Sequence, residues 1–374
     1  MRILHVSDCY LPRLGGIELQ VHDLARNQLA AGHQVEVVTA TPRARHDPTR
    51  TEVVDGVPLR RVTVDLPFEL PVHPNPGRVI RPGLRTAGYD VVHVHAGLVS
   101  PFAFMVAQAV VAERLPMVIT VHSMWGYAAP VFRLLDVVGR WSRWPVAWSA
   151  VSEVAARPLR RIAGPDVLVE VLPNGIDPDR WQVDPLPRDP ADVLIVAVMR
   201  LAPRKRALPL LQILRATREL VPASLRLRAS IVGEGPQRRA MERRLGRHGL
   251  ADWVDLPGRF PRERLRELYR RADNFVAPAN LESFGLAALE ARTAGLPVVA
   301  KAAAGISEFV EPGVEGLLAR TDAEMAQGLA TLAGSPRLRE QISLHNRSVR
   351  PAMAWPQVLR QCERAYERAH KLVG

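Results

Sequence analysis

Residues 2–40, RILHVSDCYLPRLGGIELQVHDLARNQLAAGHQVEVVTA, contain the pattern that decides the fold. The apolar run RILHVS predicts a strand, which is followed by a loop from Tyr10 to Gly16. IELQVHDLARNQLAAG predicts a helix that stops at Gly32, and HQVEVVTA predicts a second strand. Further strand signals follow at residues 90–95, 117–122, 146–152 and 169–174. Alternating strands and helices predict a parallel sheet that helices cover on both faces.

The same alternation begins again after a proline-rich stretch. Residues 178–190, PDRWQVDPLPRDP, contain four prolines and little periodicity, which is typical of a linker. Strands and helices then alternate from residue 192 to residue 301, and Trp355 to His370 predict a final amphipathic helix. A chain of 374 residues is too long for one ordinary core. We therefore expect an α/β domain at 1–177, a linker at 178–190, a second α/β domain at 191–350 and a C-terminal helix at 351–374.

Composition excludes several classes of protein. Hydrophobic residues make up 47% of the chain and charged residues 24%, which are globular values. The N-terminal residues lack the pattern of a secretory signal, and the apolar uncharged run 96–112 is better explained as a buried helix than as a membrane span. Cys9 and Cys362 match no metal spacing and are expected to be buried free thiols. These features predict a cytoplasmic protein.

The formal charge of +12 is concentrated in one region. Residues 200–271 contain 19 basic and 7 acidic residues, so the remainder of the chain is balanced. Such a region favours anionic partners, which include nucleotide diphosphates, acidic lipid headgroups and nucleic acid. Solvated helix faces would also account for it, because arginine is used throughout the chain. A nucleic-acid partner is not expected, since the basic residues form neither a recognition helix nor an aromatic platform.

The stretch ESFGLAALE, residues 282–290, carries the strongest functional signal. A helix that begins near Phe284 would present free backbone N–H groups and the positive end of its dipole to a phosphate. Glu282 before that helix and Glu290 inside it could each accept hydrogen bonds from sugar hydroxyls. The alternative is an ordinary helix with two solvated carboxylates.

Other candidate residues follow predicted strands, where ligands of open parallel sheets bind. Arg200 and Lys205 come directly after an apolar strand and could neutralise a diphosphate leaving group. Gly15 and Gly16 open the first helix and would let backbone amides approach a phosphate. His122 ends the strand MVITVH, and a buried structural imidazole is the alternative interpretation there.

Two neighbouring histidines and an acidic pair are weaker candidates. His93 and His95 end an adjacent strand and are interpreted as structural or acceptor-facing. Asp177 and Asp179 match a D-x-D metal motif only formally, because they lie in a turn without neighbouring acids. The chain has no HExxH motif, Cys/His cluster, G-x-S-x-G elbow or P-loop, so zinc hydrolases, serine hydrolases and kinases are excluded. No metal site is predicted.

Four of the seven tryptophans lie within 24 residues, interleaved with arginines at 133, 140 and 143: Trp125, Trp141, Trp144 and Trp148. Core packing is the favoured explanation. An interfacial patch beside a lipid acceptor is the alternative.

With these residues in place, the chain resembles the retaining GT-B glycosyltransferases of family 4 over almost its whole length. The matching segments occur in the expected order: LPRLGGIELQVHDLARNQLAAGHQVEVVT, DVVHVH, TVH, LPNGID, the Arg200/Lys205 pair, IVGEGP, DLPGR, ESFGLAALE, AGLPVVA and GVEGLL. The GGIE opening is most similar to the branch that acts on lipid-linked or inositol-containing acceptors. The resemblance implies two Rossmann-like domains that face each other across a cleft, with the C-terminal helix crossing back to the first domain.

The resemblance also implies roles for individual residues. Glu290 would hold the ribose hydroxyls of the nucleotide, and Glu282 and His122 would contact the donor sugar. Arg200 and Lys205 would bind the diphosphate, assisted by Gly16 and the backbone amides of the segment from Phe284 through Gly285 to Leu286. The loops that contain Gly233, Gly235 and Arg259 would border the base. Met199 and Arg206 depart from the family pattern, which usually has glycines at these positions.

The implied activity is the transfer, with retention of configuration, of a hexose or N-acetylhexosamine in glycan biosynthesis. The donor would be a UDP- or GDP-linked sugar, the acceptor a glycan or lipid-linked hydroxyl, and no metal or other cofactor would be needed. The protein would be cytoplasmic, and an anionic membrane surface is a candidate partner. A sugar-nucleotide epimerase of the same fold and a non-catalytic protein that binds anionic ligands or nucleic acid are the alternatives.

Overall fold

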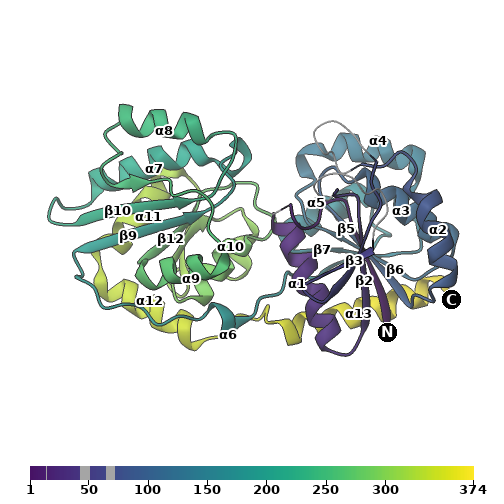
Figure 1. Ribbon diagram of the computed structural model, residues 1–374. Helices are drawn as coiled ribbons and strands as arrows, with labels where there is room; N and C mark the ends of the chain where they lie inside the picture. Colours follow the sequence, from purple (N-terminus) through teal and green to yellow (C-terminus); the bar gives the residue numbers. More distant parts are fainter. Residues whose placement is uncertain (14, 43–50, 65–71) are drawn as a thin grey trace. The chain divides into compact units, whose positions relative to one another are not determined.

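The computed structural model describes residues 1–13, 15–42, 51–64 and 72–374, which form two compact units. The first unit comprises Met1–Gly175 and Trp355–Gly374, and the second comprises Ile176–Ala354. Each unit has its own sheet flanked by helices (Figure 1). Of the loop predicted from Tyr10 to Gly16, residue 14 lies outside the described residues.

The sheet of the first unit has eight strands in the order β3-β4-β2-β1-β5-β6-β7-β8. All pairs are parallel except β3 with β4. The central strands are buried along nearly their whole length, as expected for a parallel sheet covered on both faces. The strands are β1 (Arg2–Ser7), β2 (Gln34–Thr39), β3 (Thr51–Val54), β4 (Val57–Arg61), β5 (Val91–Ala96), β6 (Met117–Val121), β7 (Ala147–Ala150) and β8 (Val169–Val171).

The β3–β4 hairpin was not predicted from the sequence, although a turn signal is present. Asp55 and Gly56 connect the strands and both have positive φ, at 47° and 84°. Consecutive positive φ values are typical of the two-residue turns that Asp-Gly forms in hairpins. This dipeptide between two short apolar runs is the signal that could have placed the hairpin.

Within the described part of the first unit, five helices connect its strands. They are α1 (Gly16–Ala30), α2 (Pro76–Thr86), α3 (Pro101–Ala112), α4 (Ala129–Gly139) and α5 (Glu153–Ala163). The predicted uncharged run at 96–112 is largely α3, whose residues are mostly buried, as expected. Among the described residues, no helix is both long enough and apolar enough to cross a membrane.

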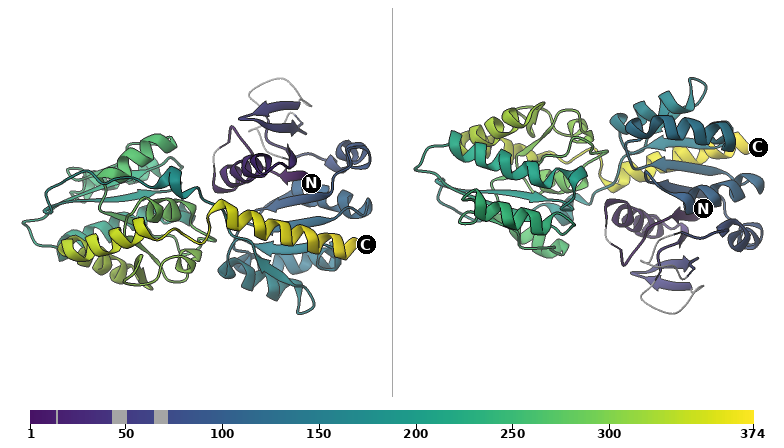
Figure 2. Two further views of the ribbon diagram at one scale, coloured as in Figure 1. Left: turned by 90° about the horizontal axis from the view of Figure 1, so that it is seen from below. Right: turned by 90° about the horizontal axis from the view of Figure 1, so that it is seen from above.

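The C-terminal helix α13 (Trp355–Val373) returns to the first unit, which confirms the predicted crossing. Both views of Figure 2 show it, in yellow, alongside the strands of that unit. Trp355, Cys362 and Tyr366 of α13 pack into the same apolar core as Ile3 and Val118. The helix begins at residue 355 rather than 351, and Cys362 is buried as predicted, whereas Cys9 is only half-buried.

Core packing, the favoured explanation for the tryptophan cluster, is confirmed for three of its four members. Trp125, Trp141 and Trp148 are buried. The ring of Trp141 lies edge to face with both of the others, with centroid distances of 5.9 Å to Trp125 and 5.1 Å to Trp148. Trp125 also stacks on Phe132 of α4 at 3.8 Å between centroids. Such contacts hold α4 against the core, and the interfacial tryptophan patch is wrong for these three residues.

The sheet of the second unit has six parallel strands in the order β11-β10-β9-β12-β13-β14. They are β9 (Asp192–Val198), β10 (Arg226–Val232), β11 (Val254–Asp255), β12 (Asn274–Ala277), β13 (Val298–Lys301) and β14 (Gly316–Ala319). The helices are α6 (Pro178–Trp181), α7 (Ala207–Leu220), α8 (Arg238–Arg247), α9 (Arg262–Arg271), α10 (Leu286–Thr293), α11 (Asp322–Gly334) and α12 (Pro336–Ser348). Apolar residues of α7 and α11 pack with β9 and β10 into one core.

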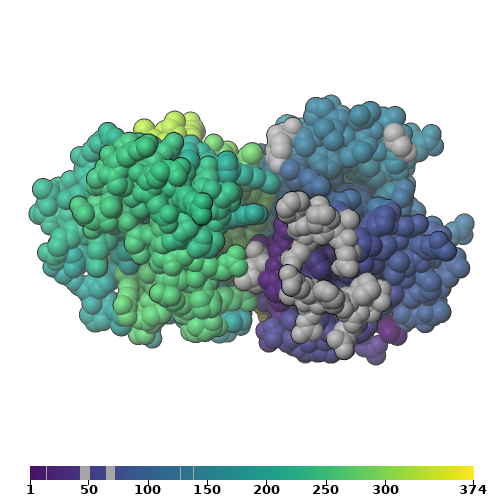
Figure 3. Space-filling model, turned by 45° about the horizontal axis from the view of Figure 1, so that its top comes forward, coloured from purple at the N-terminus to yellow at the C-terminus, as the bar shows by residue number. Residues whose placement is uncertain are grey.

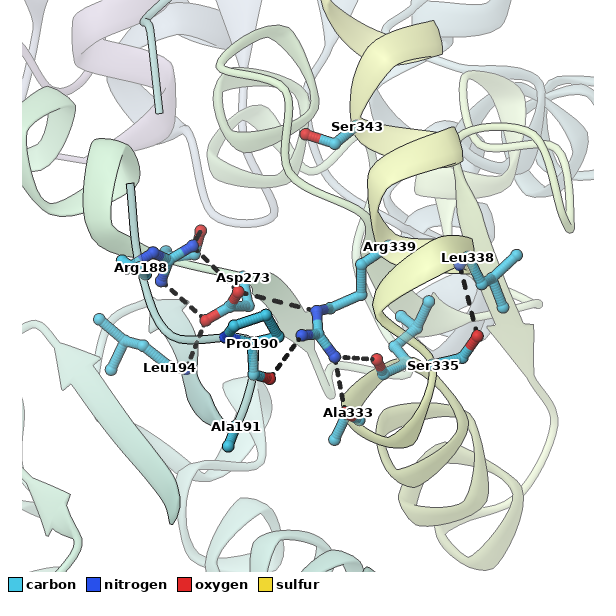
Figure 4. A network of polar contacts seen from close by, with 12 residues as sticks. Arg188, Pro190, Ala191, Leu194, Asp273, Ala333, Ser335, Leu338, Arg339 and Ser343 are labelled. Carbon is cyan, nitrogen blue, oxygen red and sulfur yellow. Dashed lines mark hydrogen bonds and ion pairs between the residues drawn. The ribbon is translucent and has the colours of Figure 1, made fainter. Parts of the chain in front are cut away.

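The proline-rich stretch 178–190 is not a free linker, which corrects the prediction. It belongs to the second unit, and its α6 turn buries Trp181. Further along, Arg188 forms a two-pronged ion pair with Asp273 at 2.7 and 2.9 Å, and Arg339 donates to the carbonyl of Pro190 at 3.1 Å (Figure 4). Proline therefore marks irregular backbone here, but buried polar contacts fix that backbone to the domain.

Candidate active site

Three loops that follow strands of the second unit are joined through their backbones. Met199 N–H donates to the carbonyl of Val232 at 3.0 Å, and Leu201 N–H donates to that of Glu234 at 2.9 Å. Gly233 N–H donates to the carbonyl of Gly258 at 2.8 Å. Because the strands are parallel, their carboxyl ends lie at one edge of the sheet, and these bonds order the backbone there.

Close backbone approach explains two of the predicted glycines. A Cβ at Gly233 would lie 1.8 Å from the Met199 carbonyl oxygen, and one at Gly235 would lie 2.4 Å from that of Leu201. Side chains at these positions would push the loops apart. Arg259, predicted to border the base, is exposed in the next loop directly after Gly258.

Lys205 and Glu282, 77 residues apart in the chain, form an ion pair. Lys205 ends a short 3₁₀ turn after β9, and Glu282 lies in the loop after β12. Their side chains are 34% and 18% exposed, so the pair is accessible to a ligand at this edge. Arg200 precedes the same turn, and its exposed side chain forms no ion pair within the described part of the chain.

Arg206, which departs from the family's glycine, retains the backbone conformation that glycine favours. Its φ is 59°, in the left-handed region, directly before α7. The guanidinium forms two bonds of 2.7 Å with the Asp322 carboxylate, and Lys301 Nζ approaches the same carboxylate at 2.6 Å. These cations lower the pKa of Asp322 to about 2. The sequence analysis missed Asp322; the signal was a second lysine, Lys301, at a strand end in a lysine-poor chain.

The ESFG segment begins its helix later than predicted. α10 begins at Leu286, because Gly285 has a φ of 95° that no α-helix accommodates. A Cβ at Gly285 would lie 2.3 Å from Ile306 Cγ1, so the segment packs closely against the loop after β13. Gly305 N–H donates to the Glu282 carbonyl at 2.9 Å.

Burial separates the two carboxylates of this segment. Glu290 is buried within α10, whereas Glu282 is half-buried at the edge of the sheet. Phe284 is also buried, with its ring 5.7 Å from that of Phe309. The segment is thus held on both sides, and Glu282 extends from it toward Lys205.

The remaining predicted residues lie in the first unit. Gly16 begins α1, and a Cβ there would meet nothing within 4 Å, whereas one at Gly15 would lie 2.4 Å from Glu18 Oε2. His122 follows β6, and its backbone N–H donates to the Ala96 carbonyl at 2.8 Å. The two segments follow β1 and β6, which both pair in parallel with β5, so they lie at the carboxyl-end edge of the same sheet.

His122 belongs to a buried chain of hydrogen-bonded side chains. Its Nε2 lies 3.1 Å from His95 Nδ1, and His95 Nε2 lies 2.9 Å from His5 Nδ1. His5 Nε2 lies 2.6 Å from Gln28 Oε1. The sequence analysis found His122 and His95 but missed His5 and Gln28, for which isolated polar residues on buried elements were the only signal.

Burial keeps these imidazoles uncharged. Desolvation lowers the pKa of His5 and of His122 to about 4, and the pKa values of His93 and His95 fall well below the ordinary value. At neutral pH each ring therefore has one N–H donor and one acceptor nitrogen.

One cluster of the described residues has metal-ligand spacing. Single ligand atoms of His5, His93 and His95 lie within 4.8 Å of one another. All six of their ring nitrogens, however, have side-chain partners at hydrogen-bond distance. This favours a hydrogen-bonded network over a metal site. The Asp177 carboxylate caps α6, and Asp179 pairs with Arg350.

The basic region from 200 to 271 is mostly helix surface. Arginines of α8 and α9 form ion pairs with glutamates three or four residues away, such as Arg238 with Glu242 and Arg271 with Glu267. Such surface pairs are typical of a solvated helix face. The paired arginines are therefore explained as helix surface without a ligand.

Comparison with known proteins assigns the chain to a family. Residues 14–180 match the model for Glycosyltransferase Family 4, and residues 182–348 match that for Glycosyl transferases group 1. D-inositol 3-phosphate glycosyltransferase of Frankia alni is 30% identical, over 95% of each chain. The chain belongs to glycosyltransferase family 4. The suspected family is confirmed.

Two further similarities agree with this assignment. This family 4 protein is 26% identical to a phosphatidylinositol N-acetylglucosaminyltransferase component of Arabidopsis thaliana, over 99% of this chain and 83% of the relative. Its fold is similar to the crystal structure of Anabaena Alr3699/HepE in complex with UDP and glucose, with a TM-score of 0.75 at 20% identity, over 98% and 99% of the two chains. The predicted GT-B fold is confirmed.

Proposed function

We propose that this family 4 glycosyltransferase moves a hexose or N-acetylhexosamine from a UDP- or GDP-linked sugar to an acceptor hydroxyl, with retention of configuration. The observation that carries the proposal is the Lys205–Glu282 pair beside the exposed Arg200, at the edge of the sheet where α10 begins. A diphosphate leaving group would displace the carboxylate from Lys205 and gain two cations.

The proposed chemistry needs no metal ion. Arg200 and Lys205 would neutralise the charge that develops on the leaving diphosphate, which is the task a divalent cation performs elsewhere. Glu282, released from Lys205, would accept hydrogen bonds from the donor sugar, and His122 would contact that sugar near the reacting carbon. Glu290 would bind the ribose hydroxyls, and Gly16 would admit a phosphate oxygen near the start of α1.

For the acceptor we propose an inositol-containing or lipid-linked molecule. Two of the relatives have names that specify inositol phosphate or phosphatidylinositol. A lipid-linked acceptor would require the protein to reach a membrane surface, and the first unit has a helix with the necessary properties.

Helix α4 exposes an apolar face. Val131, Leu134, Leu135 and Val137 are 58%, 67%, 54% and 75% exposed. Arg133 and Arg140, also exposed, lie on or beside this helix, and its region forms part of the outer surface of the first unit (Figure 3). Apolar side chains rimmed by arginine suit the headgroup region of an anionic bilayer. We therefore assign to α4, rather than to the buried tryptophans, the membrane contact.

Calorimetric titration with UDP, GDP and ADP, with and without EDTA, tests the donor site. We expect one nucleotide to bind equally with and without EDTA, and we expect Glu290→Ala to abolish that binding. Analysis of the anomeric product by NMR, with the matching nucleotide sugar, then tests retention. No binding of any of the three nucleotides would overturn the proposal.

Sedimentation with phosphatidylglycerol vesicles at low salt tests the membrane contact. The double variant Leu134→Ser/Val137→Ser should lose sedimentation, because it removes two strongly exposed apolar side chains of α4. Leu344→Ser, at a leucine of α12 that is 54% exposed, is the matched control and should sediment normally. Failure of the unaltered protein to sediment would refute the role of α4.

A further inference from the structure

A continuous chain of buried side chains connects Gln28 of α1 to histidines on β1 and β5, to His122 directly after β6, and to Tyr366 of α13. A neutral imidazole donates from one nitrogen and accepts at the other, so each bond in such a chain fixes the direction of the next. The donor of each hydrogen bond can be identified by starting from an atom that can only accept a hydrogen bond. The backbone carbonyl oxygen of Ile119 is such an atom.

The first part of the chain runs from Ile119 to α13. Ser149 Oγ donates to the Ile119 carbonyl at 3.3 Å, so the Thr120 hydroxyl must donate to Ser149 across their 2.7 Å contact. His93 Nε2 then donates to Thr120 at 2.7 Å. This leaves His93 Nδ1 as an acceptor for the hydroxyl of Tyr366 at 3.0 Å.

The second part runs from α13 to the edge of the sheet. Having donated its proton, the Tyr366 oxygen accepts from Gln28 Nε2 at 2.8 Å, which turns Gln28 Oε1 toward His5 Nε2 at 2.6 Å. His5 Nε2 therefore carries a proton, and His5 Nδ1 accepts from His95 Nε2 at 2.9 Å. His95 Nδ1 in turn accepts from His122 Nε2 at 3.1 Å.

We infer that Gln28 is a positioning residue that, through His5 and His95, holds the proton of His122 on Nε2 and the lone pair on Nδ1. The inference rests on the proposed function, in which His122 contacts the transferred sugar. With the lone pair on Nδ1, that nitrogen can act only as a hydrogen-bond acceptor. The opposite tautomer would present an N–H there instead. The side chain that sets this choice lies on α1, three hydrogen bonds from His122.

The tautomer can be measured without substrate. In nitrogen-15 NMR of the full-length protein with labelled histidine, protonated and unprotonated ring nitrogens have distinct shifts, and His122→Gln assigns the His122 signals by their absence. We expect a neutral His122 with its proton on Nε2. A proton on Nδ1 in the unaltered protein would overturn the inference, whether or not transfer activity is detected.

Two variants of Gln28 test its part in this arrangement. Gln28→Met removes the acceptor for His5 Nε2–H while keeping the length of the side chain, so His122 should become a mixture of tautomers. Gln28→Glu keeps an oxygen facing His5 and should preserve the Nε2–H form. An unchanged His122 spectrum in Gln28→Met would show that Gln28 does not set the tautomer.

Kinetics distinguish a positioning role from a structural one. Gln28→Met should lower kcat about 10-fold, by analogy with the smallest losses seen when a metal-ligating histidine loses the partner that orients it. KM for the nucleotide sugar should remain unchanged, because Gln28 is buried behind His5 and touches neither the nucleotide nor the diphosphate in the proposed site. Gln28→Glu should restore kcat. A rise in KM with unchanged kcat, or no rescue by glutamate, would contradict the inference.

Discussion

The sheet edges of the two units present opposite kinds of chemistry. In the first unit, His122, His95 and His5 are buried and neutral, and their properties depend on which nitrogen holds a proton. In the second unit, Lys205 and Glu282 are partly exposed and charged, and their properties depend on Coulomb attraction. The two α/β units therefore differ at the carboxyl-end edges of their sheets. Hydrogen-bond direction determines the properties of the first unit's edge, the neutral edge, and charge determines those of the second unit's edge, the charged edge.

The difference has a physical cause. A buried charge without a partner costs several kcal/mol, so an interior site of four imidazoles remains stable only when they are neutral and fully hydrogen-bonded. A site that binds a diphosphate needs cations, and cations remain ionised most readily where water or a carboxylate can reach them. The comparison can be tested by perturbing each edge in turn.

The largest effect should come from the charged edge. Lys205→Ala should lower kcat/KM about 100- to 1000-fold, the range found when a group that stabilises developing charge is removed. Steady-state transfer kinetics would measure it. The matched control is Arg239→Ala, which removes an exposed cation of α8 and should change kcat/KM less than about 2-fold. Equal losses in both variants would assign the effect to the general basic field instead.

As the pH falls, the first unit, with its buried neutral histidines, should lose stability at a higher pH than the second unit. The pKa values of His5 and His122, about 4, lie below the unfolded value of 6.5, so the unfolded chain binds more protons between these limits. Stability is therefore full above pH 6.5 and falls as the pH decreases toward 4, by at most about 1.4 kcal/mol per pH unit for each imidazole. Burial raises the pKa of Asp8 to about 7, so at this residue the folded protein binds a proton that the unfolded chain does not. This opposes the loss of stability from one of the histidines.

Urea unfolding at pH 7, 6 and 5, followed by tryptophan fluorescence, measures this loss, because five of the seven tryptophans lie in the first unit. His122→Gln removes one of the titrating imidazoles, so the free energy of unfolding should fall less steeply with decreasing pH, by the equivalent of one proton. In the second unit, the pKa of Asp322 is lowered from 3.8 to about 2, so the stability that this carboxylate contributes is lost only below about pH 4. A first unit whose stability stays constant from pH 7 to 5 would contradict the prediction.

The smallest effect concerns the backbone of the charged edge. Arg206→Ala removes the pair with Asp322 and leaves a non-glycine residue at a φ of 59°. Arg206→Gly removes the same pair but relieves the left-handed strain, so it should be about 1 kcal/mol more stable than the alanine variant. Thermal unfolding of both variants measures the difference. If the alanine variant were the more stable, strain at this position would be negligible.

Patterns along the chain predicted much of the charged edge. Arg200 and Lys205 follow an apolar strand, and Glu282 precedes a helix, so periodicity placed them in loops at the ends of strands. The same reasoning missed the Asp55-Gly56 hairpin, and it mistook 178–190 for a linker. Proline content reports on backbone geometry and not on tertiary contacts such as that of Arg188 with Asp273.

The sequence by itself determined the two α/β units and the family, because hydrophobic periodicity, glycine positions and motif order are properties of the chain itself, and the return of α13 was implied by the resemblance to that family. Tertiary structure alone decided that Lys205 meets Glu282, that Asp322 holds Arg206, and that Gln28 reaches His122 through two other histidines. Each of these contacts joins distant segments, and its direction depends on which donor faces which acceptor. That information exists only after strands and helices have packed.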